Sequence, residues 1–352
     1  MLYGIPLIVV FISLLSNIDK RYKNIFFLTA ILVLIIFCGL RDPFLYPDIG
    51  NYYDFFKGDF NDKDENFGLG YSMLNKSFSI LSSSFYFLIM GISILVISSY
   101  AQLIKSYSPY IFISLILYIT INYYPSFFLL RQYVAMAIFV FSIKYVINRD
   151  PIKYTICTLI ALSVHMTAAV ALPFYALYTI RYSKRNMLLL LVGSVVAILL
   201  FMGLKDIVNL ISIYYAGYFE SETDAPAWQR ALMKVYIMMV YLFTLKKHFY
   251  DEGINRVVFY SMLINVVICI AAINMYGVFR LRNYYALADF IGIPIMLQQA
   301  SKKQLKQKTL VYILITIYVI LLLISFHNFI QGENMDNQYQ FFWNGIEYRS
   351  LK

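Results

Sequence analysis

The chain has 352 residues, of which 61% are hydrophobic and only 14% are charged, and its mean hydropathy is +0.68. Soluble domains are nearer half apolar and a quarter charged, so a soluble globular fold is nearly excluded. The net charge of +10 is spread along the chain, with no basic cluster interleaved with aromatic residues, and this argues against a nucleic-acid partner.

Apolar runs of 16 to 20 residues recur along the whole chain and predict an all-α, polytopic integral membrane protein in contact with membrane lipids. We expect one transmembrane domain over residues 1–352. The first two spans are predicted at Leu2–Leu15 and Asn24–Leu40, with three basic residues between them. The positive-inside rule places that connection in the cytoplasm and the N-terminus outside.

A polar segment of residues 41–84 follows and is predicted to be an external loop, because it carries seven acidic residues, Asp42, Asp48, Asp54, Asp59, Asp62, Asp64 and Glu65. Apolar residues in its second half recur at helical spacing: Tyr71, Met73, Leu74, Phe78 and Leu81. This spacing is typical of a helix that lies along the membrane interface.

Spans three and four are predicted at Phe85–Ile104 and Pro109–Tyr124, so the fifth span begins at Arg131 near the external face. The next segment, Ile152–Ile180, has 29 residues, which is long for one span and short for two. Basic residues decide between the alternatives. A short hairpin with His165 at its outer tip puts 17 basic residues inside and 12 outside, whereas a single crossing gives 14 and 15, so we favour the hairpin.

Five later spans complete about twelve crossings and leave both termini outside; they are Met187–Leu204, Ala231–Leu245, Val257–Ile273, Asn283–Gln298 and Thr309–Phe326. Residues 205–230 and the C-terminal tail, residues 327–352, are predicted to be external. No repeat of fixed period is present in the sequence, and this weakens a transporter with inverted repeats.

The predicted topology brings ionisable residues from four segments to the outer face: Arg41, Asp42, Asp48, Arg131, His165, Arg280 and Arg282. An ionisable residue at membrane depth is a functional candidate because burying its charge is costly. A guanidinium group can bind two phosphate oxygens at once, so the arginines suit an anionic ligand. The carboxylates and the imidazole could act as general bases.

Each candidate also has a structural interpretation. Arginines at span ends often extend to the interface without further function, Asp42 before a proline is typical of a turn, and His165 could hydrogen-bond at a helix end. Asp289 lies seven residues after Arg282, so the two share a helix face and suggest an ion pair.

The three cysteines, Cys38, Cys157 and Cys269, all lie in apolar runs and are interpreted as small buried residues. The three histidines are far apart and belong to no metal-binding pattern. We therefore expect no metal ion and no cofactor.

Four motifs in order resemble the EpsG-type family of bacterial exopolysaccharide and O-antigen (Wzy-type) polymerases. They are Asp48-Ile49-Gly50-Asn51-Tyr52, Arg131-Gln132-Tyr133-Val134-Ala135-Met136-Ala137, the histidine segment from Ala161 to His165 with Thr167-Ala168-Ala169 and Pro173, and Arg280-Leu281-Arg282-Asn283-Tyr284. Residues 65–71 are also similar to a family element.

The resemblance implies a glycosyltransferase of the bacterial inner membrane whose active site faces the periplasm or exterior. It would join undecaprenyl-diphosphate-linked oligosaccharide repeat units, as donor and acceptor, into O-antigen, capsule or exopolysaccharide. A chain-length regulator and a flippase of the same pathway are implied partners, and a GT-C-like architecture is compatible with the resemblance. The motif positions assign His165, Arg131, Asp48 and Arg280 to catalysis, and Gln132, Arg282 and Tyr284 to substrate binding. The predicted topology adds Arg41 and Asp42 to the substrate-binding residues.

Two other functions remain open at this stage. An O-antigen ligase or another lipid-linked glycosyltransferase would share the arginines and differ in its acceptor. A glycolipid flippase or transporter should carry charges along a path through the membrane, whereas the predicted charges favour the outer face.

Overall fold

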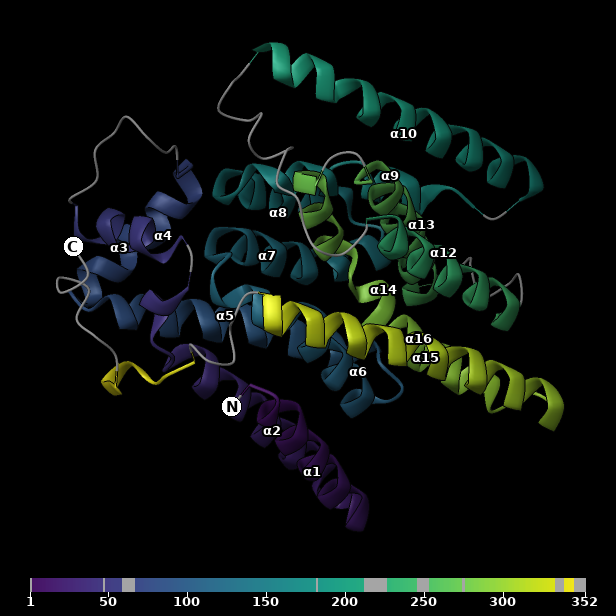
Figure 1. Ribbon diagram of the computed structural model, residues 1–352, viewed down its shortest axis with the longest axis horizontal. Helices are drawn as coiled ribbons and strands as arrows, with labels where there is room; N and C mark the ends of the chain where they lie inside the picture. The colour runs from purple at the N-terminus through teal and green to yellow at the C-terminus, as the bar shows by residue number, and fades with distance from the viewer. Residues whose placement is uncertain are drawn as a thin grey trace. The chain divides into compact units, whose positions relative to one another are not determined.

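The computed structural model describes residues 2–46, 48–58, 67–181, 183–211, 227–245, 253–273, 276–332 and 339–344 (Figure 1). Its described secondary structure is helical apart from an isolated bridge between Arg41 and Phe341, which confirms the all-α class. The α-helices are α1 Gly4–Ile18, α2 Lys23–Gly39, α3 Ile49–Lys57, α4 Leu69–Leu81, α5 Phe85–Tyr107, α6 Ile111–Tyr118, α7 Leu130–Ile147, α8 Pro151–Val164, α9 Phe174–Thr179, α10 Lys184–Ile211, α12 Ala227–Thr244, α13 Gly253–Ala271, α14 Leu287–Phe290, α15 Gly292–Ala300 and α16 Leu305–Gly332.

Four helices of the described chain, α5, α7, α13 and α16, are long and apolar enough to cross a membrane. Five shorter apolar helical segments accompany them, including α1, α2 and α8. Many large apolar side chains on these helices are exposed, as on α16, where they need a hydrocarbon environment. These features are those of a membrane protein, while the count of twelve crossings stays a prediction.

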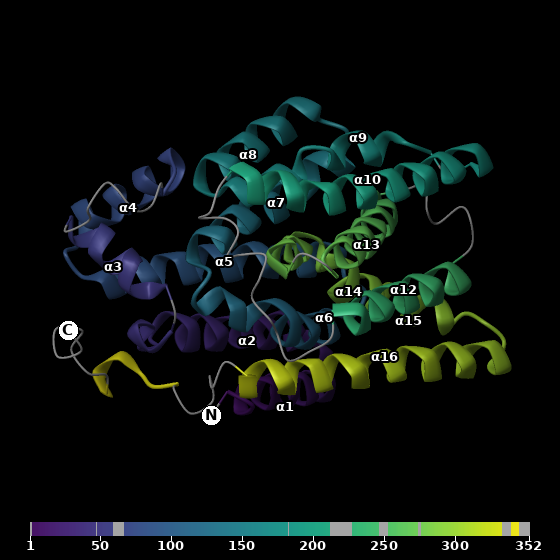
Figure 2. The same ribbon diagram turned by 45° about the horizontal axis from the view of Figure 1, so that its top comes forward.

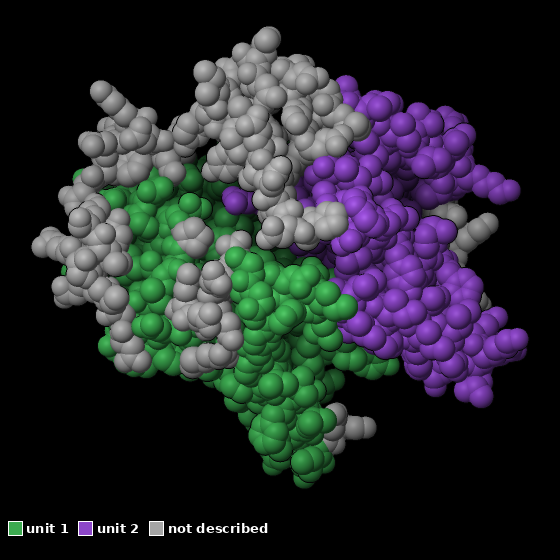
Figure 3. Space-filling model, viewed as in Figure 1, with its two compact units in different colours: residues 1–172, 322–352 green, residues 173–321 purple. Residues whose placement is uncertain are grey.

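The chain divides into two compact units (Figure 3). Unit 1 consists of residues 1–172 and 322–352, and unit 2 consists of residues 173–321. Unit 2 is therefore inserted in sequence between the two segments of unit 1, and α16 begins in unit 2 and ends in unit 1.

In unit 1, α5, α7 and α8 lie side by side, and α3 and α4 lie at one end of this layer (Figures 1 and 2). Helix α7 is the best buried of the three, because most of its side chains contact a neighbouring helix. Its second residue is Arg131, so a helix begins where the sequence predicted the start of a span.

The chain reverses direction at His165. Helix α8 begins at Pro151, where the Asp150 carboxylate accepts a hydrogen bond from the Lys153 backbone N–H at 3.1 Å. It ends at His165, and the 3₁₀-helix η5, Met166–Ala171, returns alongside it. A hydrogen bond of 2.6 Å from the Tyr154 hydroxyl to the Ala171 carbonyl joins the two arms. His165 is thus at the tip of the reversal.

The described part of the C-terminal segment closes on the end of α2. The Phe342 N–H donates to the Leu40 carbonyl at 3.0 Å, and the Asp42 N–H donates to the Gln340 carbonyl at 2.7 Å. Unit 1 is therefore held together by hydrogen bonds between residues about 300 positions apart in sequence.

The predicted loops differ from the structure at their ends. Helix α10 extends through Lys205 to Ile211, and α16 extends past His327 to Gly332. Residues 59–66, 212–226, 333–338 and 345–352 of the predicted loops lie outside the described residues. Helix α4 contains the predicted amphipathic segment, and its exposed face carries Leu69, Met73 and Ile80.

Unit 2 departs from the prediction at the span expected over Asn283–Gln298. The chain there forms a 3₁₀-helix, η7 (Tyr276–Tyr285), followed by the short helices α14 and α15. Proline lacks a backbone N–H and cannot continue a helix from the preceding turn, so the helix restarts at Gly292 with Pro294 in its first turn.

Candidate functional site

Arg131 is held on aromatic side chains at the N-terminal end of α7. Its guanidinium carbon lies 4.5 Å from the centroid of the Phe67 ring and 5.7 Å from that of Tyr52. Phe67 in turn stacks on Phe55, with ring centroids 4.2 Å apart. Arginine stacks favourably on aromatic faces, so the three rings fix the side chain in place while it remains partly exposed.

The Tyr52 hydroxyl oxygen accepts hydrogen bonds from the guanidinium and from the backbone N–H of Arg131. Burial raises the pKa of Tyr52, and the positive charge of Arg131 partly opposes this shift. Two of the four sequence motifs, around Asp48 and around Arg131, therefore meet in the structure.

The electrostatics at this position favour an anion. The N-terminal end of a helix carries the equivalent of about half a positive charge, so a cation in the first turn is unfavourable unless a negative group is nearby. Helix α7 has no side-chain cap at its N-terminus, and its second residue is the cation Arg131. A phosphate group there would interact with both the helix end and the guanidinium.

Asp48 precedes α3 in a left-handed backbone conformation, with φ of 65° and ψ of −10°. Such a conformation is unusual for a residue with a Cβ and is often found at functional sites. An aspartate before a helix commonly caps it, yet the Asp48 carboxylate makes no capping hydrogen bond. The side chain is exposed and within electrostatic range of Tyr52.

Two glycines join the Arg131 region to the histidine hairpin. A Cβ on Gly68, whose φ is +74°, would lie 2.6 Å from the Ser163 carbonyl oxygen, and one on Gly70 would overlap the Ser163 hydroxyl. Only glycine allows this approach. Because Phe67 is adjacent to Gly68, the segment that supports Arg131 also contacts the residues just before His165.

The ring of His165 has a defined tautomer. Its Nδ1 accepts a hydrogen bond from the Thr167 backbone N–H at 3.2 Å and lies 2.7 Å from the Thr167 hydroxyl oxygen. The neutral imidazole therefore carries its proton on Nε2 and presents a donor there. This geometry suits a helix-capping residue that can donate to an anion better than it suits the predicted general base.

Arg41 and Asp42 do not face an outer cavity, which corrects our expectation for both residues. Arg41 is 0% exposed, and its guanidinium donates to the Cys38 and Phe127 backbone carbonyls. Asp42 is 1% exposed, and its carboxylate accepts from the Phe44 N–H at 3.1 Å. Burial raises the pKa of Asp42, against the effect of that hydrogen bond. Both residues stabilise the turn after α2.

Gln132 and Tyr284 are also buried, with 3% and 1% of their surfaces exposed. Gln132 is adjacent to Arg131, and Tyr284 belongs to η7 in unit 2. Sequence reasoning did not single out Phe67. Tyr52, by contrast, was part of a motif whose chemistry was assigned to Asp48 alone.

Unit 2 holds the remaining predicted residues on η7. Arg280 and Arg282 are both partly exposed, and the guanidinium carbon of Arg282 lies 3.8 Å from the centroid of the Phe279 ring. The predicted ion pair of Asp289 has a different partner. Its carboxylate binds Lys234 of α12 and accepts a hydrogen bond of 2.7 Å from the Tyr318 hydroxyl.

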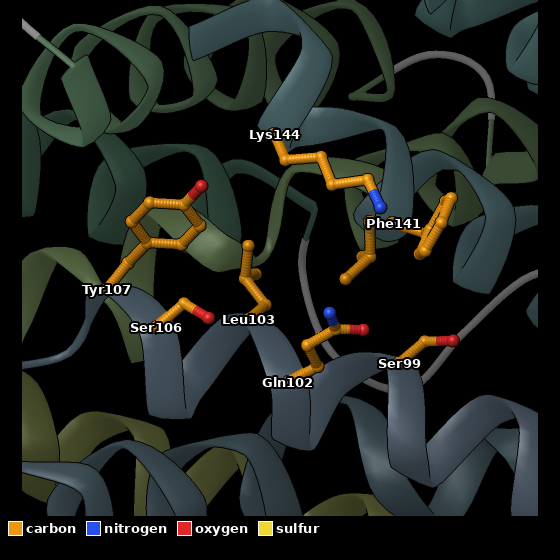
Figure 4. A pocket seen from close by; sticks show the side chains of 8 residues that line it. Ser99, Gln102, Leu103, Ser106, Tyr107, Phe141 and Lys144 are labelled. Atoms are coloured by element: carbon orange, nitrogen blue, oxygen red, sulfur yellow. The ribbon is translucent and has the colours of Figure 1, made fainter. Parts of the chain in front are cut away.

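A cavity of about 150 Å³ opens near the other end of α7 (Figure 4). Ser99, Gln102, Tyr107 and Lys144 line it, and the Lys144 ammonium lies 3.6 Å from the centroid of the Phe141 ring. Lys144 follows Arg131 by 13 residues, or about 20 Å along a helix. The cavity is therefore separate from the Arg131 region. Among the described residues, no three His, Cys, Asp or Glu side chains are grouped to hold a metal ion.

The apolar helices and the cation–aromatic site at a helix N-terminus define a helical membrane protein that can hold an anionic group. The model of the EpsG family matches residues 24–342, and the chain belongs to this family, which is related to exopolysaccharide polymerases. All four motifs lie within the matched residues. No curated protein and no solved structure matches the chain.

Proposed function

We propose that the protein is a polysaccharide polymerase that joins lipid-diphosphate-linked repeat units at the outer face of the bacterial inner membrane. The observation that carries this proposal is the position of Arg131 in the first turn of α7, stacked on Phe67 and hydrogen-bonded to Tyr52. Such an arrangement binds an anion, and a diphosphate is the anionic part of the substrates that the family resemblance implies.

Arg131 and the α7 N-terminus would hold the diphosphate of the donor and stabilise the negative charge that develops as it leaves. The donor is already activated by its diphosphate, so the reaction needs no nucleotide. The guanidinium is held by aromatic rings before the substrate arrives, and this reduces the cost of ordering it.

In the bond-forming step, the acceptor hydroxyl oxygen would attack the anomeric carbon of the donor sugar. The bond from that carbon to the phosphate oxygen breaks, and its electron pair leaves with the lipid diphosphate. Asp48 is the proposed base that takes the hydroxyl proton, because its carboxylate is exposed and does not cap α3. The Nε2–H of His165 would donate to the donor's phosphate oxygens.

A deletion strain tests the function directly. Loss of a polymerase leaves single repeat units on the cell surface, whereas loss of a flippase or a ligase leaves none. Polymer of normal length in the deletion strain would contradict the proposal.

The orientation rests on the split of 17 basic residues inside and 12 outside. In a variant lacking Cys38, Cys157 and Cys269, single cysteines at Arg181 and Lys205 should react with an impermeant thiol reagent from opposite sides. Reaction of both from the same side would contradict the predicted topology.

A further inference from the structure

The cavity near the end of α7 lies between two helices of unit 1, at the opposite end of α7 from Arg131 (Figure 4). Helix α5 lines one side of it with a face whose residues recur at intervals of three and four positions, Ser99, Gln102, Leu103 and Ser106. Three of these four side chains are polar. Polar groups within a membrane span are costly unless they face a partner, water or a ligand, so this face is a candidate binding surface that the polymerase reaction does not use.

Lys144 of α7 supplies the charge at this cavity. It is the only charged residue among the described side chains that line the space. Its ammonium lies 3.6 Å from the centroid of the Phe141 ring and 4.9 Å from that of Tyr145. Aromatic faces attract a cation but carry no net charge, so the lining of the cavity keeps one net positive charge.

Hydrogen-bonding groups accompany this charge. Figure 4 shows the Gln102 amide and the Lys144 ammonium projecting from the two helices into the space between them. The Ser106 hydroxyl also lines the cavity, whereas that of Ser99 donates to the Leu95 carbonyl at 2.8 Å and offers its lone pairs. An ammonium with amide and hydroxyl donors beside it suits a phosphate group, because hydrogen bonds to an anionic oxygen are stronger than those between neutral groups.

The rest of the lining is apolar. Leu103 and Val140 are buried, whereas Phe141 is 39% exposed beside the Lys144 ammonium. A free phosphate ion would gain nothing from these side chains. A phospholipid would gain from them, because it joins a phosphate group to acyl chains that favour an apolar surface. The lining therefore favours a lipid headgroup over a free anion.

The cavity also lies where the sequence predicts the cytoplasmic leaflet. Lys105 and Lys144 occupy the last turns of α5 and α7, and both belong to the connections that the distribution of basic residues places inside. The cytoplasmic leaflet is rich in anionic lipids, which attract basic residues near the membrane surface. The C-terminal ends of the two helices carry partial negative charge, so binding of an anion there depends strongly on Lys144.

We infer that the cavity between α5 and α7 binds the headgroup of an anionic phospholipid, with the Lys144 ammonium on the phosphate and Gln102 and Ser106 as further donors. The acyl chains of the lipid would follow the exposed side of Phe141. The site is separate from the proposed active site, because Lys144 lies about 20 Å from Arg131 along α7. The inference therefore stands whether or not the protein is a polymerase.

Native mass spectrometry of the purified full-length protein with dioleoylphosphatidylglycerol tests the inference. The unchanged protein should retain this lipid, and K144Q should bind it about tenfold to hundredfold more weakly, the loss expected for a hydrogen bond between charged groups. K144R keeps the charge and should keep most of the affinity. K105Q removes a lysine at the same end of α5 that does not line the cavity, and it should behave like the unchanged protein. An equal loss in K105Q and K144Q would show that surface charge alone attracts the lipid, and it would overturn the inference.

Two comparison ligands separate the lipid from other sources of the phosphate. Dioleoylphosphatidylcholine has the same chains and phosphate with an added positive charge, so Lys144 should disfavour it. Glycerol phosphate lacks the chains and should compete only weakly. Displacement of phosphatidylglycerol by glycerol phosphate at equal concentration would overturn the assignment to a lipid, and equal binding of the two lipids would overturn the assignment to an anionic headgroup.

A second variant keeps the test decisive if K144Q does not fold. S99L fills the cavity with an apolar side chain and changes no charge, and it should also lose phosphatidylglycerol. The lipid should raise the thermal unfolding midpoint of the unchanged protein but not that of S99L, because a ligand stabilises only the state that binds it. Full retention of the lipid by a folded S99L would place the lipid elsewhere and reject the site.

Discussion

Arg41 and Arg131 are two arginines of unit 1 that lie at similar distances from a phenyl ring, 4.8 Å from Phe127 and 4.5 Å from Phe67. Each also lies within 6 Å of a tyrosine ring, Tyr46 or Tyr52, but their exposure and hydrogen-bond partners differ. The guanidinium of Arg41 is fully buried and binds two backbone carbonyls, whereas that of Arg131 is partly exposed at the end of a helix.

This difference shows that a cation on an aromatic ring is not by itself a binding site. Arg41 uses its hydrogen-bond donors on the Cys38 carbonyl in the last turn of α2 and on the Phe127 carbonyl before α7, and it therefore stabilises the fold. Arg131 lies where the helix end adds to its own positive charge, and this makes an anionic ligand favourable. Substitution of Arg41 should therefore lower stability, whereas substitutions in the Arg131 region should lower activity.

The largest effect is expected in the Arg131 region, at Asp48. Asp48→Asn removes the proposed base and keeps the size of the side chain, so polymerisation should slow by about 10²–10⁴-fold. The rate is measured with purified protein and lipid-linked repeat units. Asp54→Asn changes another aspartate of the same segment and serves as the control. Equal rates for the two variants would remove Asp48 from the proposed mechanism.

Arg131→Gln should lower the rate by about 10²–10³-fold, the usual loss when one donor to a developing negative charge is removed. Arg131→Lys should also be strongly defective, because lysine keeps the charge without the planar fork. Protein abundance should stay normal in both. The exposed Arg21→Lys is the matched control, and full activity of Arg131→Lys would show that only the charge is needed.

Arg41→Gln should lower stability, in contrast to the substitutions of Asp48 and Arg131. It leaves the Cys38 and Phe127 carbonyls without their charged donor, and such a loss costs about 1.5–3 kcal/mol. The thermal unfolding midpoint and the membrane abundance should both fall, while the activity per folded molecule stays within about a factor of two. A stable but inactive Arg41→Gln would place Arg41 in the site after all.

Gly70→Ala tests the contact between the Arg131 region and the hairpin. The added methyl group would overlap Ser163, and we expect a destabilisation of about 1–3 kcal/mol, typical of overpacking. The control is Gly193→Ala, where a Cβ meets no atom within 4 Å. If both variants have the same unfolding midpoint, the hairpin does not depend on this approach.

The smallest effects are expected from two substitutions at His165 that separate the roles of its nitrogens. The amide oxygen of His165→Asn can still accept from the Thr167 N–H, so stability should be kept and any loss should fall on the rate. His165→Gln places its amide near the Nε2 position, so it should lose about 1 kcal/mol of capping while keeping a donor. A fully active asparagine variant would make His165 a purely structural cap.

The sequence predicted those parts of the fold that depend on local chemistry. The break at His165 and the start of α7 next to Arg131 follow from hydropathy and from the distribution of basic residues, which act on each segment separately. The contact between the Asp48 motif and the Arg131 motif was harder to predict. Phe67 carries no charge, and the similarity of residues 65–71 to a family element assigned it no role, so the sequence did not indicate that it supports Arg131.

The partner of Asp289 was mispredicted for a physical reason. Seven residues correspond to two turns of an α-helix, but the chain after Arg282 is 3₁₀-helical as far as Tyr285 and then restarts twice. A 3₁₀-helix has three residues per turn, so the shared face is lost. Lys234, which binds Asp289 instead, is 55 residues away, beyond the reach of any spacing rule.

The hydrogen bonds between the end of α2 and residues 340 and 342 have a consequence for synthesis. The ribosome makes Arg41 and Asp42 early, but their turn receives its last backbone partners only when residues near the end of the chain emerge. Unit 2 is completed while unit 1 still lacks these partners, so a nascent chain arrested before residue 339 should expose this turn to proteases and membrane chaperones.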